Sequence, residues 1–306
     1  SEIETNWLFD STTSLWYVNL GSNIGGNIRE NGTPMFMVPW NTSLSVTAPT
    51  IPSGGFAFDP TNFILYIRPA SGKVSGNTYE VSKRLYVLNA SSTNSGLTLD
   101  GIDIQGASRH GIVLTNRSNF NFRNGSVKYC GGYYETTVST RLGNGIELAA
   151  GCNNTLVENS VFSDIFDSAG TSQLYSGSSA TIFNHIWRYN TFSKCRLAGV
   201  EISTQTANQT ISGITVRGNF FKDLGLGWAG SVSNNSGVNI TNNGGVTCTL
   251  QNIYIDGNKF YNCSNYNILL NAGVSQSNIQ VSRNFINTFS LRGIRTTGPA
   301  NIFGNI

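Results

Sequence analysis

The chain has 306 residues, and only 11% of them are charged, against about 25% in an average soluble domain. Its formal net charge of +3 is too small to predict binding to nucleic acid or to an anionic membrane surface. It contains no run of about 18 apolar residues, so the sequence predicts no membrane insertion.

Residues 1–94 carry no internal repeat. They contain short segments rich in aromatic and branched residues, at positions 15–18, 35–38 and 63–67, and turn sequences such as Asp59-Pro60-Thr61-Asn62 separate them. Such segments predict short strands. We expect a small β-rich N-terminal capping module that covers the open end of the domain that follows, because exposed strand edges invite aggregation.

Residues 95–306 repeat one pattern at intervals of about 20 to 50 residues, which predicts a repeat architecture. A small polar residue is followed two positions later by a large apolar one. The small residues are Gly125, Ser160, Asn190, Asn219, Asn258 and Asn284, and Asn305 begins a further copy. The apolar residues include Phe162, Phe192, Phe221 and Phe260, which we expect to touch from repeat to repeat.

Each repeat contains three short strands and no helical pattern. Apolar residues alternate before the turn, as at Ile214 and Val216, and a glycine opens another strand, as at Gly199. Three strands per repeat pack best as the coils of a solenoid, about seven here, because one coil cannot bury its apolar side alone. We expect the asparagines to form a hydrogen-bonded ladder, and we attribute their choice partly to their tolerance of left-handed backbone.

This pattern resembles the right-handed parallel β-helix proteins of the pectin-lyase-like superfamily. The resemblance covers roughly residues 95–306 and rests on the asparagine turns, the stacked aromatic column and the glycine-led strands. It implies an all-β fold, with a right-handed parallel β-helix preceded by the capping module. These motifs are specific for the fold and say little about the reaction.

Five cysteines are present, and three of them, Cys130, Cys195 and Cys263, share one position of the repeat. This placement predicts buried thiols that act as small hydrophobic side chains. The sequence has no Cys-x-x-Cys motif and two histidines, so we predict no zinc site. We interpret His110 as a turn residue and His185 as a core residue.

Polar residues of the glycine-led strands predict a functional face. Alternation should expose Glu147, Glu201 and Asn239 on one sheet, with Ser172 or Gln173 between the two glutamates. The turn before this face adds more charged residues, namely Asp164, Asp167, Lys194 and Arg196. So many charges at one corner of a charge-poor chain predict a site, and the alternative is a set of solvated surface charges.

Two long insertions flank this face. One carries Tyr133, Tyr134 and Arg141, and the other carries Trp228. Long loops on a repeat scaffold usually form its binding face. We therefore predict that these residues, with Gln173, Arg196 and Asn239, bind substrate, the aromatic rings by stacking on sugars. The alternative is that the rings pack within the loops.

Two kinds of polysaccharide cleavage fit these residues. Glycoside hydrolysis needs two carboxylates, which Asp164 or Asp167 with Glu201 or Glu147 would supply. A lyase needs a base, such as Lys194 or Arg196, and a cation that neutralises the sugar carboxylate. Asp164, Asp167 and Glu201 would then hold calcium. The local signatures of pectate lyases are missing, which argues against pectate as the substrate.

The competing prediction is a non-catalytic β-helix that binds a glycan or has a structural role, such as an adhesin or a tail protein. The composition, rich in small polar residues, fits both classes. We predict a polysaccharide partner, an extracellular, cell-surface or virion location, and a homotrimer as one assembly. A phage-type depolymerase would satisfy all three. A sugar-sized cleft with converging carboxylates would favour an enzyme.

Overall fold

The computed structural model describes residues 2–21, 25–38, 50–91, 93–135, 140–175, 180–230, 232–242, 247–271, 276–289 and 291–306. Within these ranges the regular elements are β-strands. No helix in this part of the chain has the length and apolarity that crossing a bilayer would need.

Three parallel sheets run the length of the solenoid. The first, called the site sheet below, contains in order β10 (Tyr86–Ser91), β13 (His110–Thr115), β18 (Ile146–Leu148), β21 (Ser168–Leu174), β24 (Ala198–Thr204), β27 (Ser236–Asn242), β30 (Tyr266–Asn271) and β33 (Arg292–Thr296). The second contains β11 (Leu97–Asp100), β14 (Phe120–Arg123), β19 (Asn153–Glu158), β22 (Thr181–Arg188), β25 (Thr210–Arg217), β28 (Thr249–Asp256), β31 (Gln276–Ser282) and β34 (Asn301–Phe303). The third contains β12 (Asp103–Gln105), β15 (Ser126–Cys130), β20 (Val161–Ile165), β23 (Thr191–Ser193), β26 (Phe220–Lys222), β29 (Lys259–Cys263) and β32 (Phe285–Phe289).

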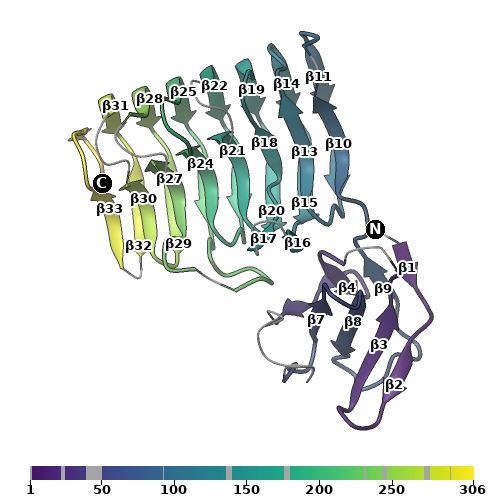
Figure 1. The fold of residues 1–306 in the computed structure, drawn as a ribbon. Helices are drawn as coiled ribbons and strands as arrows, with labels where there is room; N and C mark the ends of the chain where they lie inside the picture. The colour runs from purple at the N-terminus through teal and green to yellow at the C-terminus, as the bar shows by residue number, and fades with distance from the viewer. Residues whose placement is uncertain are drawn as a thin grey trace.

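Successive coils stand side by side, from β10 and β11 at one end to β33 at the other (Figure 1). Each strand pairs in parallel with the strand of the next coil, so the predicted all-β parallel β-helix is confirmed. The division predicted at residue 94 falls between β10 and β11, and the first parallel strand therefore precedes it.

A stack of phenylalanine rings fills the solenoid. Ring centroids lie 5.0 Å apart between Phe162 and Phe192, 5.0 Å between Phe192 and Phe221, and 4.7 Å between Phe221 and Phe260. The predicted contact from coil to coil is therefore confirmed. The stack also explains the glycines, because a Cβ on Gly199 would collide with the Phe221 ring. The five cysteines are free and buried, as predicted.

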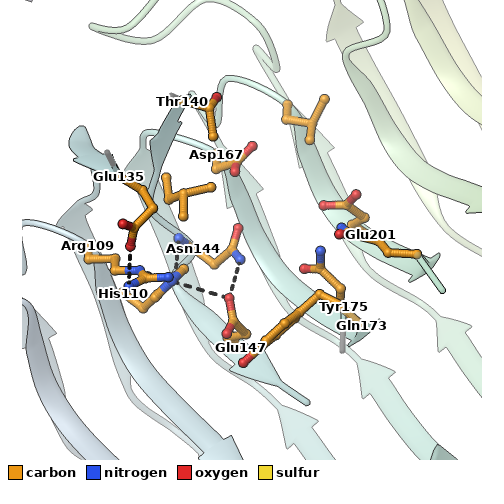
Figure 2. A pocket seen from close by; sticks show the side chains of 13 residues that line it. Arg109, His110, Glu135, Thr140, Asn144, Glu147, Asp167, Gln173, Tyr175 and Glu201 are labelled. Atoms are coloured by element: carbon orange, nitrogen blue, oxygen red, sulfur yellow. Dashed lines mark hydrogen bonds and ion pairs between the residues drawn. The ribbon is translucent and has the colours of Figure 1, made fainter. Parts of the chain in front are cut away.

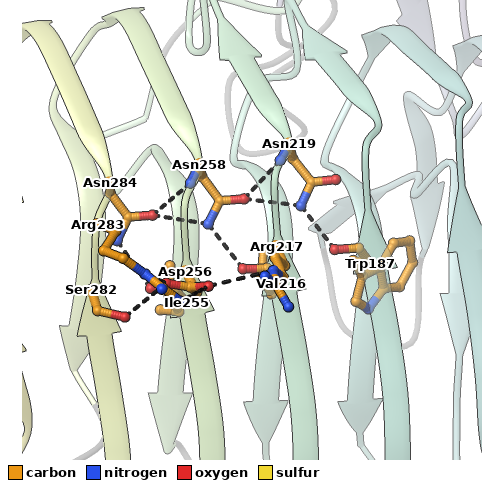
Figure 3. A network of polar contacts seen from close by, with 10 residues as sticks. All are labelled: Trp187, Val216, Arg217, Asn219, Ile255, Asp256, Asn258, Ser282, Arg283 and Asn284. Carbon is orange, nitrogen blue, oxygen red and sulfur yellow. Dashed lines mark hydrogen bonds and ion pairs between the residues drawn. The ribbon is translucent and has the colours of Figure 1, made fainter.

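The predicted asparagine ladder runs from coil to coil (Figure 3). The Asn219 side-chain amide donates to Trp187 O at 2.8 Å and to Asn258 Oδ1 at 3.0 Å, and Asn258 repeats the pattern toward Asn284. Our conformational explanation of the ladder was wrong. Left-handed backbone occurs one residue earlier, at Asn159 and Tyr189, so the ladder selects asparagine for its amide and not for its φ angle.

Replacing Asn219 with alanine should lower the free energy of unfolding by about 1–3 kcal/mol, because buried partners in two neighbouring coils would lose their hydrogen bonds. Asn89→Ala is the control, since Asn89 is exposed in β10, has no left-handed backbone, and accepts from Ser91 Oγ at the surface. Urea denaturation of both variants would measure the difference. A loss for Asn219→Ala no larger than that of the control would contradict the assignment.

His185 lies inside the solenoid and is fully buried, as predicted. Its Nε2 lies 2.7 Å from Cys152 O, and its Nδ1 lies 2.8 Å from Ser172 Oγ. A carbonyl only accepts, so Nε2 carries the proton, and Ser172 donates to Nδ1 while accepting from Trp187 Nε1 at 3.3 Å. Burial lowers the pKa of His185 to about 4, so the ring is neutral at neutral pH.

The N-terminal module contains two sheets. One has the order β1 (Glu2–Glu4), β9 (Tyr79–Val81), β4 (Ile28–Glu30) and β5 (Thr33–Pro34). The other has the order β2 (Leu8–Asp10), β3 (Leu15–Asn19), β8 (Ile64–Arg68), β7 (Gly55–Asp59) and β6 (Phe36–Met37). Their shared core includes Phe56 and Phe58 and extends to Phe166 and Trp228 of the solenoid.

The module packs against the side of the solenoid. The Asn27 side-chain amide donates to three main-chain carbonyls of the solenoid, those of Ala107, Tyr129 and Gly131, at 3.0–3.2 Å. The main chains approach so closely that a Cβ on Gly132 would collide with the Gly26 carbonyl. Leu88, Leu97 and Leu99 of the first coil stay half-buried, so these contacts do not enclose the end of the solenoid as we expected.

Candidate active site

A cavity of about 470 Å³ opens on the site sheet, a volume in the usual range for a small-ligand pocket. Strands β13, β18, β21 and β24 supply one side. A hairpin of β16 (Tyr133–Glu135) and β17 (Thr140–Leu142) supplies another. Its lining residues are Arg109, His110, Glu135, Thr140, Leu142, Asn144, Glu147, Asp167, Gln173, Tyr175, Leu197, Glu201 and Gln205, most of which Figure 2 labels.

Two glutamates share one outward column of the site sheet. Glu147 pairs with Thr171, and Thr171 pairs with Glu201, so two strand spacings, roughly 9.5 Å, separate the glutamate backbones. Thr171 therefore stands where we predicted Ser172 or Gln173. The glutamates are not exposed, contrary to the prediction, and only 6% and 8% of their surfaces are accessible. Residues outside the sheet, such as Leu142 and Tyr175, enclose the same pocket.

The Glu147 carboxylate is held from three sides. The Asn144 side-chain amide donates to its Oε2 at 2.9 Å, and His110 Nε2 lies 3.3 Å from the same oxygen (Figure 2). The Tyr175 hydroxyl bonds to Glu147, and burial together with this negative charge raises the pKa of Tyr175. Glu147 is thus a fixed acceptor in the pocket wall.

His110 links this carboxylate to the rest of the wall. The Asn144 main-chain N–H donates to His110 Nδ1 at 2.9 Å, and Arg109 Nε–H donates to His110 Nε2 at 3.0 Å, the nitrogen that also faces Glu147. The Tyr86 ring stacks on the imidazole with centroids 6.0 Å apart. Burial lowers the pKa of His110 to about 4, against the opposing effect of Glu147, so this ring is neutral at neutral pH.

Glu201 and Asp167 complete the site. Ser168 Oγ donates to Glu201 Oε2 at 2.8 Å. Burial, then the negative charge of Asp167, raises the pKa of Glu201 to about 7, although the Ser168 bond opposes the rise. Burial likewise raises the pKa of Asp167 to about 6, with Arg196 opposing and Glu147 adding to the rise. Both carboxyl groups therefore titrate above their ordinary range, and Glu201 keeps its proton to a higher pH than Asp167 does.

Four of the predicted site residues line this pocket, namely Glu147, Asp167, Gln173 and Glu201. Asp164, Lys194 and Arg196 do not. Asp164 and Lys194 have φ angles of 56° and 53° and occupy a column of left-handed turn residues. The Arg196 guanidinium lies over the Phe166 ring, 4.7 Å from its centroid, and reaches the site only through its charge.

The predicted aromatic rims are occupied by contacts within the protein. The Arg109 guanidinium lies over the Tyr133 ring, and the Arg141 guanidinium lies over the Tyr134 ring. Arg141 also donates to Gly132 O at 2.7 Å and to Phe58 O at 3.3 Å.

Trp228 is 7% accessible, packs on Phe56 and Phe166, and donates to Asp164 O at 3.0 Å. Asn239 is also buried, so the expected exposure of these two side chains was wrong.

Several lining residues were not predicted, chiefly Arg109, His110, Asn144 and Tyr175. An alignment of the glycine-led strands could have identified two of these residues. His110 and Asn144 each precede the glycine of their strand, in the position that Ser168 occupies near Glu201. The residues in this column, Asn144 and Ser168, thus supply hydrogen-bond donors to the column of Glu147 and Glu201.

The site supplies acid and base groups and no metal centre. Among the described residues, no three His, Cys, Asp or Glu side chains converge so as to hold a metal ion. The calcium site that the lyase prediction required therefore has no ligand set in this part of the chain. What remains is a pair of carboxyl groups, the buried Glu201 and the half-buried Asp167, with different pKa values, an arrangement that suits general acid–base catalysis.

No protein-family model matches the chain, and no curated protein matches it. Among solved structures, a glycoside hydrolase aligns over 99% of this chain and 81% of its own, with a TM-score of 0.55 and 9% identity. An endopolygalacturonase from Stereum purpureum, complexed with two galacturonates, aligns over 71% of this chain and 70% of its own, with a TM-score of 0.48 and 15% identity. An exopolygalacturonase from Thermotoga maritima aligns over 70% of this chain and 53% of its own, with a TM-score of 0.45 and 13% identity. The chain therefore has a right-handed parallel β-helix fold, which it shares with the glycoside hydrolase structure.

Proposed function

We propose that this protein is a glycoside hydrolase that cleaves an extended polysaccharide in the pocket on the site sheet. The observation that carries the proposal is the pairing of Glu201 and Asp167 in one cavity, with pKa values raised to about 7 and about 6. The fold match to a glycoside hydrolase is compatible with this function, although 9% identity transfers no residue roles.

The roles follow from the two pKa values. Glu201 keeps its proton to a higher pH than Asp167 and is the general acid that protonates the leaving oxygen of the glycosidic bond. Asp167 loses its proton first, and it activates water or attacks the sugar directly. Glu147 keeps a fixed position through Asn144 and His110, and its charge raises both pKa values.

A hydrolase is favoured over a lyase because the two residues that we predicted as lyase bases, Lys194 and Arg196, lie outside the pocket lining. The lining cation Arg109 forms an ion pair with Glu135 at 3.2 Å. Buried carboxyl groups remain, and these suit acid–base cleavage of a glycosidic bond.

The proposal includes an extracellular, cell-surface or virion location, where extended polysaccharides occur. A phage-type depolymerase is one form of it. The predicted homotrimer is separate and stays a prediction. A non-catalytic adhesin is the alternative, and the enclosed carboxyl pair argues against it, because a binding face has no need of buried acids.

A panel of purified polysaccharides would test the proposal. We expect new reducing ends from at least one polymer and no unsaturated ends absorbing near 232 nm, roughly the wavelength used to detect lyase products, because the pocket holds an acid–base pair. Products with unsaturated ends would show a lyase. Binding without cleavage across the panel would favour the adhesin.

The pH dependence of kcat/KM should be bell-shaped. Asp167 must be ionised, so activity should rise as the pH passes about 6, and Glu201 must be protonated, so activity should fall above about 7. The two limbs report the titration of the pair, because each charge affects the other. Initial rates from pH 4 to 9 would measure them. A rate that keeps rising above pH 8 would contradict the assignment of Glu201 as the acid.

A further inference from the structure

The charges of the pocket limit which sugar can enter it. Four acidic side chains line the cavity, Glu135, Glu147, Asp167 and Glu201, whereas arginine contributes only Arg109. Arg109 is already engaged, because its Nη1 lies 3.2 Å from Glu135 Oε2 and its guanidinium lies over the Tyr133 ring. Within the described lining, no other Lys or Arg is present.

Two further groups do not change this balance. His110 is buried and neutral at neutral pH. Arg196 lies over the Phe166 ring and does not line the cavity, so its charge offsets that of Asp167 without contributing a cation to the lining. The cavity is therefore negative wherever its carboxyl groups are ionised, and it presents no unengaged cation from its described wall.

The uncharged lining includes Gln173 and Gln205, whose side-chain amides both donate and accept hydrogen bonds. The ionised carboxylate oxygens of the wall only accept. Sugar hydroxyl groups donate hydrogen bonds, so these carboxylates suit them. A uronate carboxylate only accepts, and its charge would meet charges of the same sign.

We propose that the polysaccharide is neutral where it binds in this pocket, built of uncharged sugars and not of uronates. This inference rests on the proposed glycoside hydrolase activity and adds the substrate class. Its basis is the arrangement of four carboxyl side chains and one engaged arginine around one cavity. Specificity of this kind arises from repulsion of the wrong ligand as much as from attraction of the right one.

Matched pairs of polysaccharides would test the substrate class. Each pair consists of a uronate polymer and the same polymer after chemical reduction of its carboxyl groups, so that the linkage is kept and the charge is removed. Neutral polysaccharides are included in the same series. We expect kcat/KM for a cleaved neutral or reduced polymer to exceed that for its uronate form by about tenfold or more, which is 1.36 kcal/mol of discrimination.

The outcomes separate this inference from the proposed function. Cleavage of a uronate polymer at a rate equal to or above that of its reduced form overturns the neutral substrate class and leaves the hydrolase standing. If no polymer is cleaved, the hydrolase fails, and affinity electrophoresis in the same gels still decides the class. Retardation by neutral polymers alone supports the neutral substrate class. Retardation by uronate polymers, or by no polymer, overturns it.

A single substitution gives a second test. Glu135→Gln removes the ion-pair partner of Arg109, so the arginine becomes available to a sugar carboxylate. We expect the preference for the neutral polymer to fall by a factor of about three to ten, most strongly at low salt, because added salt screens such charges. Glu158→Gln is the matched control, since Glu158 pairs with Arg188 on the second sheet, and it should leave the preference unchanged. An unchanged preference in Glu135→Gln would contradict the electrostatic explanation.

Discussion

Glu201→Gln is expected to lower kcat by about 10²–10⁴-fold, the usual effect of removing a general acid, while the protein stays folded. Glutamine has almost the same shape and keeps an oxygen that accepts from Ser168 Oγ, but it carries no proton that it can give to a leaving group. Reducing-end assays on the polymer that the wild type cleaves, and the melting temperature of both proteins, would measure the two quantities. Asp167→Asn should behave in the same way.

Asp164→Asn is the control for both. Asp164 lies in the turn before Asp167 and has the same side-chain chemistry, but it does not line the pocket. Asparagine also tolerates the left-handed backbone at this position. We expect its rate to stay within a factor of about three of the wild type. If Asp164→Asn and Glu201→Gln lost the same activity, the pocket would not be the catalytic site.

The largest effect on stability is expected at the centre of the phenylalanine stack. Phe192→Ala should lower the free energy of unfolding by about 3–5 kcal/mol, since the ring is fully buried between Phe162 and Phe221 and the coils cannot close the space. Chemical denaturation followed by circular dichroism would measure it. Ser193→Ala, at the next and half-buried position, should change stability by less than about 0.5 kcal/mol. Equal losses in the two variants would show that the stack is not the main core.

Much of the fold was predictable because its determinants recur. Most coils repeat a small polar residue, usually asparagine, a large apolar residue two positions later, and a glycine that opens a strand, and each of these has a physical role in the fold. Alternation along the glycine-led strands placed Glu147 and Glu201 in one outward column, two strands apart, as the structure has them. Recurring local geometry is the kind of information that a single sequence contains.

The candidate site was only partly predictable, because its walls come from contacts that do not repeat. The pocket depends on the β16–β17 hairpin and on Tyr175, which do not recur from coil to coil. Trp228 is an aromatic loop residue by sequence, and only the presence of Phe56, far away in the chain, buries it. Asp164 and Asp167 are close in the sequence and have the same side chain. The left-handed backbone at Asp164, near the end of β20, nevertheless places the two carboxyl groups in different environments.

The junction of the N-terminal module with the hairpin has a mechanical consequence. The hairpin that walls the pocket is tied at its root by Gly132 against Gly26, and along β17 by Arg141, which donates to Phe58 O. The N-terminal module therefore supports the hairpin, and the rigidity of the pocket wall depends on the packing of the module's own core. Destabilising that core would make the pocket wall more mobile without changing a carboxyl group. We therefore expect removal of the first strands to reduce substrate selectivity under conditions in which the solenoid is still folded.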